Sequence, residues 1–242
     1  IDENQRVTLK DNGSIGEIKK YARYYNAGIH KMELKSQFRC DGSDGYLAWL
    51  DNVLEIRGTA NFDLDSKYDF KVFDDPNELR KAIEEKNKIN NKSRLVAGYC
   101  WNWISEGKNK SDVYDITIPE YNFGMSWNLG NSSTWAIDKE SVNEIGCIHT
   151  CQGLEFDYVG VIIGDDLRYE NDHIVTDYTK RAKTDQSIKG INKIAKEEGI
   201  EEAKKITDSI IKNTYKTLMT RGMKGCYVYC TDKKLSNYLK NR

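Results

Sequence analysis

The chain has 242 residues, of which 38% are hydrophobic and 11% aromatic, so it is long enough to bury a substantial core. Its net charge of −1 gives no general attraction to nucleic acid, and its apolar runs are far shorter than the roughly 20 residues of a membrane span. The first residues are acidic and polar, unlike a secretion signal, so we expect a cytoplasmic protein without a membrane partner.

The first half of the chain alternates helical and extended patterns. Helices are predicted over residues 14–26, 45–54 and about 76–90, and extended segments over 30–39, 68–73 and 94–100. The first helix has a capping box formed by Ser14 and Glu17. The third begins at Asp75-Pro76, because proline suits the first helical turn.

The middle of the chain, residues 107–139, is rich in Asn, Ser, Gly and Trp and predicts a loop-rich insertion with short strands. Beyond it, strands are expected over 144–149, 158–163 and 225–230, and helices over 186–221 and 233–239. Gly199 should divide the long helical segment, and Gly222 suits a C-cap. Strands that alternate with helices predict an α/β fold whose parallel sheet has helices on both faces.

Six cysteines could suggest disulfides or a metal site. Their spacing is not that of a zinc knuckle, and no histidine follows at ligand distance. Buried free thiols are the expected state in a reduced cytosolic protein, and no metal site is predicted. The charge is uneven, because residues 168–242 hold 17 Lys and Arg against 10 Asp and Glu. This permits a basic face, although solvated helix faces explain the excess equally well.

The clearest chemical pattern is HTCQGLEFDYV at residues 149–159. A polar turn with Gly153 and then Glu155 separates two apolar strands. Glycine lets a backbone approach a ligand closely, and a carboxylate beside it can accept hydrogen bonds from ribose hydroxyls. From the residues alone, a tight connection with an exposed Glu155 is an equally good explanation.

This segment resembles motif V of superfamily 1 helicases, and three others resemble motifs of that superfamily in the same order. They are IDENQR at 1–6 (motif III), LKSQFR at 34–39 (motif IV) and YKTLMTRGM at 215–223 (motif VI). The stretches CDGSDGYLAWLDNVL, AGYCWNW and HTCQGLEFDYVGVIIGDDL resemble the DUF2075 family, also described as the Schlafen group 3-like DNA/RNA helicase domain. The resemblance covers nearly the whole chain.

The resemblance implies the second, C-terminal RecA-like half of a helicase. Residues 1–28 would end the first RecA-like domain, and 29–242 would form the second, with the insertion at about 101–140. The sequence contains no P-loop pattern and no Walker B pair. ATP and Mg²⁺ would therefore bind at a site shared between this domain and an N-terminal P-loop domain of the same polypeptide. We expect this chain alone to be inactive as an ATPase.

By the same resemblance, particular residues receive roles at the shared ATP site. Arg39 and Arg221 would act on the γ-phosphate and Gln5 would sense it, while the other nucleotide-side residues would be Asp2, Gly153, Glu155 and Thr220. Cys147 stands where motif V usually has Thr, and Gln152 where Lys is commoner. We expect Arg39, Arg221 and Glu155 to converge at the carboxyl ends of parallel strands, where open α/β sheets bind ligands.

Candidate contacts to DNA or RNA, with a single strand expected, are His149, Thr150, Trp101 and Trp103. Aromatic rings stack on bases without sequence preference. Core packing for the tryptophans and a backbone-satisfied histidine are the ordinary alternatives, and Asp165-Asp166 is interpreted as a turn.

Two other functions compete with an ATP-driven motor. One is a non-catalytic nucleic-acid-binding or regulatory module with a helicase-like fold. The other is a metal-dependent nuclease that would use Asp63, Asp65 and Asp69, although no lysine lies at a convincing spacing unless Lys71 serves.

Overall fold

The computed structural model describes residues 6–10, 15–30, 40, 44–64, 67–104, 110, 112–128 and 134–242. The central strands are β1 (Asp69–Phe73), β2 (Ser93–Ala97), β3 (Ile116–Ile118), β4 (Phe123–Trp127), β5 (Glu144–Gly146), β6 (Phe156–Ile163) and β9 (Gly222–Cys230). The helices are α1 (Ile15–Tyr24), α2 (Asp44–Val53), α3 (Pro76–Asn90), α4 (Ile148–Cys151), α5 (Ile191–Glu197), α6 (Ile200–Met219) and α7 (Lys233–Lys240). A hairpin of β7 (Leu167–Glu170) and β8 (His173–Thr176) and the short 3-10 turns η4 (Pro119–Tyr121), η5 (Lys139–Asn143) and η6 (Tyr178–Lys180) complete the described elements.

The central sheet has seven strands in the order β1-β9-β6-β2-β5-β4-β3. All neighbours from β1 to β4 pair in parallel, whereas β3 runs antiparallel to β4 at the edge. The prediction of an α/β, RecA-like sheet is therefore confirmed. The segment expected to be loop-rich contributes β3 and β4, so part of it extends the sheet.

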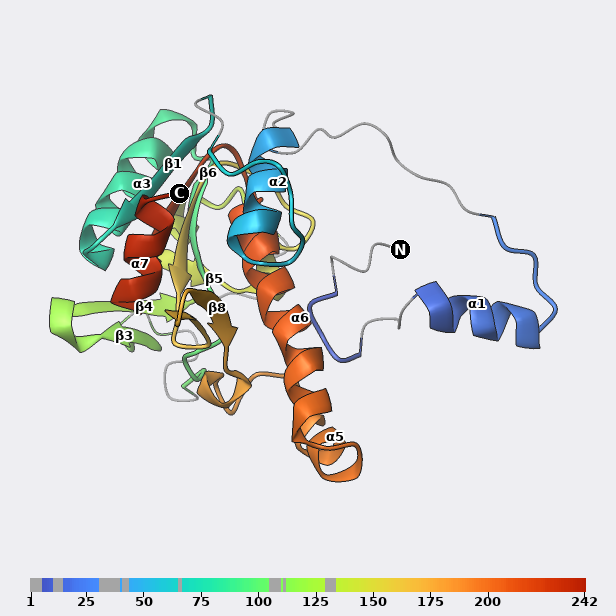
Figure 1. Cartoon of the computed structure of the whole chain (residues 1–242). Coiled ribbons are helices and arrows are strands. Elements are labelled where there is room, and N and C mark those ends of the chain that lie inside the picture. Colours follow the sequence, from blue (N-terminus) through green and yellow to red (C-terminus); the bar gives the residue numbers. More distant parts are fainter. Residues whose placement is uncertain are drawn as a thin grey trace.

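Helices cover both faces of this sheet (Figure 1). On one face α3 packs against β1, β2, β6 and β9. Lys86 of α3 places its amino group 4.0 Å from the ring centre of Tyr158 on that face. On the other face α6 packs against β6, and α2 lies beside α6, where the Tyr46 hydroxyl donates to the carbonyl of Met219 (3.1 Å). Burial on both sides explains why β2 and most of β6 and β9 are apolar.

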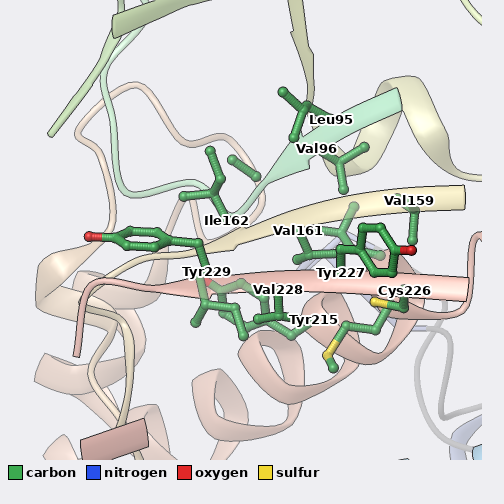
Figure 2. Close-up of a cluster of buried hydrophobic side chains, with 14 of the residues drawn as sticks. Leu95, Val96, Val159, Val161, Ile162, Tyr215, Cys226, Tyr227, Val228 and Tyr229 are labelled. Carbon is green, nitrogen blue, oxygen red and sulfur yellow. The ribbon is translucent and has the colours of Figure 1, made fainter. Parts of the chain in front are cut away.

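The neighbouring strands β2, β6 and β9 and the helix α6 form the centre of the core (Figure 2). Tyr215 projects from α6 to the ends of β2 and β6, and its hydroxyl accepts a hydrogen bond from the Gly164 amide (3.1 Å). The position of Gly98 beside it requires glycine, because a Cβ there would lie 2.1 Å from the Tyr215 oxygen. This close approach fixes the distance between α6 and the sheet.

Several predicted helix boundaries are confirmed. The Asp75 side chain accepts a hydrogen bond from the Asn77 amide (2.8 Å) and so caps α3, with Pro76 at its start. Gly199, at φ +103°, separates α5 from α6 as expected. The helix predicted near residues 14–26 is α1, which buries none of its residues.

Two local predictions are wrong. Gly222 does not cap α6, since Thr220 is the C-cap and Gly222 already pairs with Phe156 as the first residue of β9. His149 does not end a strand, because β5 stops at Gly146 and the chain turns into α4. A short apolar run cannot show by periodicity where a strand ends.

All six cysteines are free thiols, five of them buried, as predicted. Burial raises the pKa of the Cys151 thiol well above its usual value. No helix among the described residues is long and apolar enough to cross a membrane. The predictions for Asp2, Gln5, Arg39, the Ser14 cap and Asp65 lie outside the described residues, as does all of the extended segment predicted at 30–39 except its first residue.

Candidate nucleotide and nucleic-acid site

Arg221 lies in the connection between α6 and β9, and hydrogen bonds fix both its backbone and its side chain. Its carbonyl accepts from the Phe156 amide (2.8 Å). Its Nε donates to the Thr217 carbonyl (2.9 Å) and its Nη1 to the Leu154 carbonyl (3.2 Å). Only 2% of Arg221 is exposed. The residues that resemble motifs V and VI are thus in direct contact.

The turn that precedes β6 is open to solvent. Gln152, Gly153 and Glu155 are exposed, while Leu154 is half-buried. Gly153 has φ +89°, a conformation that other residues rarely adopt. Nothing lies within 4 Å of where its Cβ would be, so this backbone can be approached from outside.

Glu155 and Arg221 converge at the amino ends of parallel strands, which corrects the prediction of the carboxyl ends. Each residue directly precedes its strand, and Phe156 of β6 is level with Gly222 of β9. Parallel neighbours begin at the same edge of a sheet, so the two segments meet there. The prediction about Arg39 stays open, since that residue is outside the described ranges.

Thr220 is buried at the end of α6, where its hydroxyl donates to the Thr217 carbonyl (3.1 Å). Its own carbonyl accepts a weak hydrogen bond from the Cys40 thiol (3.9 Å). Cys40 follows the motif IV-like segment in the sequence. Its contact with Thr220 brings the residue after that segment against the motif VI-like segment.

Arg94 is a buried residue at the same edge that the sequence analysis did not single out. It is the second residue of β2, and its side chain donates to oxygens from α3 and from residues 136–141. The shortest bonds go to Ser141 Oγ, Asn87 Oδ1 and the Asp138 carbonyl, each 2.7 Å. A buried guanidinium with its donors used in this way holds the surrounding loops in place. Only its position in an apolar strand segment could have indicated burial.

An aromatic group, which we call the Trp103 cluster, lies at the opposite, carboxyl edge. It consists of Tyr99, Trp103, Trp127 and His149, from the ends of β2, β4 and β5. Trp103 stacks on Trp127 with ring centres 5.6 Å apart and planes 10° apart, and Tyr99 lies 5.6 Å from Trp127 and 5.9 Å from His149. His149 is exposed, as is 38% of Trp103, so the cluster presents rings to solvent.

Thr150 belongs to this edge as well. Its hydroxyl donates to Asn128 Oδ1 (3.0 Å) and lies 3.3 Å from the Cys147 sulfur. Trp101 does not join the cluster. Its indole N–H donates to the Thr117 carbonyl (3.1 Å), and its ring lines a separate cavity.

The two groups of candidate residues are therefore divided between the edges of the sheet. Gly146, where β5 ends, is level with Val96, which is level with Val161. Val161 is five residues beyond the start of β6, or roughly 16 Å along the strand. The chain from α4 to Glu155 connects one edge to the other.

Buried charges are paired with one another at the carboxyl edge. Arg181 is inaccessible and pairs with Asp185 (2.6 Å) and Asp166 (3.2 Å). Asp166 also accepts a hydrogen bond from the Tyr215 hydroxyl of α6. The Asp165-Asp166 pair thus lies in a turn, as predicted, and the Asp166 carboxylate is already paired with a cation.

No group of three or more His, Cys, Asp or Glu residues with a metal-binding arrangement occurs in the described part of the chain. Of the residues considered for a nuclease, Asp69 accepts a hydrogen bond from the Tyr227 hydroxyl (2.7 Å) and lies 3.4 Å from Lys71. This arrangement satisfies the Asp69 carboxylate within the protein, which argues against a role for Asp69 as a metal ligand.

Comparison with known proteins adds independent information. Residues 1–232 match the family described as Schlafen group 3, DNA/RNA helicase domain. An uncharacterized protein of Saccharomyces cerevisiae is 26% identical over 252 residues, an alignment that covers 98% of this chain and 52% of the yeast protein. The chain thus spans about half the length of this relative.

Proposed function

The chain belongs to the Schlafen group 3, DNA/RNA helicase domain family, and on this premise we propose that it is the C-terminal RecA-like half of a DUF2075-type motor. In this proposal the motor hydrolyses ATP and acts on DNA or RNA. The observation that carries the proposal is the hydrogen bond between Arg221 and the Leu154 carbonyl, next to the exposed Glu155. This bond connects the guanidinium of Arg221 to the turn that carries the Glu155 carboxylate, at the amino edge of the parallel sheet.

At this edge the ATP site would be shared with a P-loop domain that the present sequence does not contain. That domain would supply the backbone amides for the phosphates and the ligands for Mg²⁺. Glu155 would accept hydrogen bonds from the ribose beside the open backbone of Gly153. The length of the yeast relative leaves room for another domain in proteins of this kind.

Arg221 would act as an arginine finger after a small change of the turn that contains Leu154. With 2% exposure, its guanidinium can reach a phosphate only if this turn moves. Exchange of a neutral carbonyl acceptor for an anionic phosphate oxygen favours such a movement, because both partners of the new hydrogen bond are charged and a guanidinium can bind a phosphate through two parallel bonds. Arg39, Gln5, Asp2 and Thr220 keep their predicted roles in this proposal.

The nucleic acid would cross the carboxyl edge, at the Trp103 cluster. Exposed aromatic rings give sequence-tolerant stacking for single-stranded bases. His149 and Thr150, on α4, would contact the backbone of the strand. Since α4 and the next turn connect this edge to Glu155, binding of a nucleic-acid strand would affect the ATP site through this one short segment.

The test compares two proteins, this chain and a longer polypeptide that includes the sequence upstream of Ile1. We expect ATP hydrolysis stimulated by single-stranded DNA or RNA only for the longer protein. ATP hydrolysis by this chain that survives repurification would contradict the proposal that two domains share the ATP site. A longer protein that binds no ATP would contradict it as well.

A second candidate is the non-catalytic nucleic-acid-binding module. The burial of Arg221 favours it, because a side chain held by two backbone carbonyls already has a structural role. This candidate predicts binding of single strands by the longer polypeptide with no ATP-dependent change in affinity. A nucleotide-dependent change in strand affinity would support the motor instead. The cytoplasmic location stays a prediction.

A further inference from the structure

A cavity of about 370 Å³ opens at the carboxyl ends of β2, β6 and β9. Trp101 follows β2, Asp165 follows β6 and Thr231 follows β9, and all three line it. The start of α7, η6 and the segment around η4 supply the remaining walls. The cavity is therefore at the edge opposite to Arg221 and Glu155, and the proposed ATP site does not use it.

Two aromatic side chains of this cavity are held in position by their neighbours. The indole N–H of Trp101 donates a hydrogen bond to the Thr117 carbonyl (3.1 Å), which fixes the ring at the wall of the cavity. Tyr121 meets Tyr229 edge to face, with ring centres 5.9 Å apart and planes at 83°. Flat rings with a fixed orientation are suited to contact with a planar ligand such as a nucleobase.

Two lysines also line the cavity. Lys233, the first residue of α7, donates to the Tyr121 hydroxyl and lies 5.0 Å from that ring centre. Lys180 is exposed, and within the described part of the chain its amino group has no acceptor. Lysine ammonium groups are common ligands of phosphate.

Two carboxylates in the lining of the cavity balance the positive charges of the two lysines. Asp165 accepts a hydrogen bond from the Thr231 hydroxyl (2.7 Å), and Glu120 is exposed at the rim. A balanced lining does not favour a bare anion. It suits a ligand that has an anionic group for the lysines and also hydroxyl or amino donors for the carboxylates.

We propose that this cavity binds a nucleoside monophosphate group, with the base against Trp101 and Tyr121 and the phosphate between Lys180 and Lys233. Ribose hydroxyls or a base amino group would donate to Asp165 and Glu120. The volume falls at the lower end of the usual range for small-ligand sites, roughly 300–1,000 Å³. The carboxyl ends of parallel strands are also where α/β sheets generally hold ligands.

This chemistry has two sources, a free mononucleotide and a phosphorylated end of a nucleic-acid strand. Isothermal titration of the purified protein with AMP, adenosine and inorganic phosphate tests the site itself. We expect AMP to bind with a Kd below about 1 mM, the weak end of specific recognition, and more tightly than adenosine or phosphate. Oligonucleotides with and without a 5′-phosphate then separate the two sources. Tighter binding of the phosphorylated oligonucleotide identifies a strand end as the ligand, and equal binding of both identifies a free nucleotide.

The variant Lys180→Ala/Lys233→Ala should weaken AMP binding at least tenfold and leave adenosine unchanged. Trp101→Leu should weaken both ligands. The exposed pair Lys189→Ala/Lys193→Ala removes the same charge and should have no effect, and circular dichroism checks that each variant is folded. Glu155→Gln, at the opposite edge, should bind AMP like the unaltered protein.

Three results would overturn the proposal. They are no saturable AMP binding, AMP binding unaffected by both the lysine and the tryptophan variants, and loss of AMP binding in Glu155→Gln with retention in the lysine variant. The last result would place AMP at the proposed ATP site. Each leaves the motor proposal standing, because that depends on ATP turnover by the longer polypeptide.

Discussion

The guanidinium of Arg221 donates to the backbone carbonyl of Leu154 across 3.2 Å, although the two residues are 67 positions apart in the chain. The bond links the turn before β6 to the turn before β9, and a second bond, from the Phe156 amide to the Arg221 carbonyl, runs beside it. Movement of either turn therefore changes the surroundings of the other.

In a polypeptide that includes the P-loop domain, Arg221→Ala should lower turnover by about a thousandfold, which is the lower range for arginine fingers. ATP affinity should change little, because a finger acts on charge that develops in the transition state. Arg221→Lys should restore little activity, since a point charge cannot replace the planar fork. Turnover and the affinity for a fluorescent ATP analogue are measured for each variant. Reduced affinity with unchanged turnover at saturation would mean that Arg221 only binds the nucleotide.

Replacement of Arg94 by Met should reduce the free energy of unfolding by about 3–5 kcal/mol. The change removes the partner of several buried oxygens, including Ser141 Oγ and Asn87 Oδ1, and unsatisfied buried groups are costly. Urea denaturation measures the effect. Arg80→Ala is the matched control, because its ion pair with Glu84 is partly exposed and should contribute well under about 1 kcal/mol. Equal losses for both variants would contradict the supporting role of Arg94.

The substitution Gly98→Ala should destabilise the protein by about 1–3 kcal/mol through overpacking. Its new methyl group would lie 2.1 Å from the Tyr215 hydroxyl oxygen, so α6 or the end of β2 must shift. Gly58→Ala serves as the control, since nothing lies within 4 Å of a Cβ there.

A double variant with Tyr215→Phe identifies the cause of the Gly98 effect. Removal of the oxygen should make the alanine less harmful than it is in the unaltered protein, and thermal denaturation of the four proteins gives the coupling. Strict additivity of the two substitutions would show that the Tyr215 oxygen is not what resists the methyl group.

The stability contributed by Asp157 should depend on pH. Partial burial tends to raise the pKa of this carboxyl, but hydrogen bonds from Lys224 and Asn90, each 2.7 Å, outweigh burial and lower the pKa below 3.8. A pKa that folding lowers gives stability that is present above the unfolded value and is lost as the pH falls through the folded one. The unaltered protein should therefore be more stable than Asp157→Asn at pH 6, with a difference that shrinks below about pH 4.

Urea denaturation at pH 6 and at pH 3 measures this difference. Asp63→Asn, at an exposed position, controls for the general loss of a negative charge. A difference between the protein and Asp157→Asn that is the same at both pH values would refute the ionic contribution.

Local patterns in the sequence determined which elements exist. The cap at Asp75, the break at Gly199 and the apolar runs of β2, β6 and β9 depend on neighbours in the chain, so each could be predicted from short windows. The order of the helicase-like segments, likewise a property of the linear sequence, indicated the family.

Tertiary structure alone decided where the candidate residues meet. Periodicity assigns a residue to a strand but does not give the order of the strands, so it could not show that Glu155 and Arg221 share the amino edge. The Trp103 cluster needed β2, β4 and β5 to end side by side.

The buried arginines show most clearly which properties depend on the sequence and which depend on the tertiary structure. By residue type Arg94 and Arg181 favour exposure, and only the apolar run after Arg94 argues against it. Their burial depends on acceptors that the fold brings from elsewhere, such as Ser141, 47 positions from Arg94, and Asp166 in the turn after β6. Sequence determines that a guanidinium needs acceptors, and only the packing of distant segments decides whether water or protein provides them.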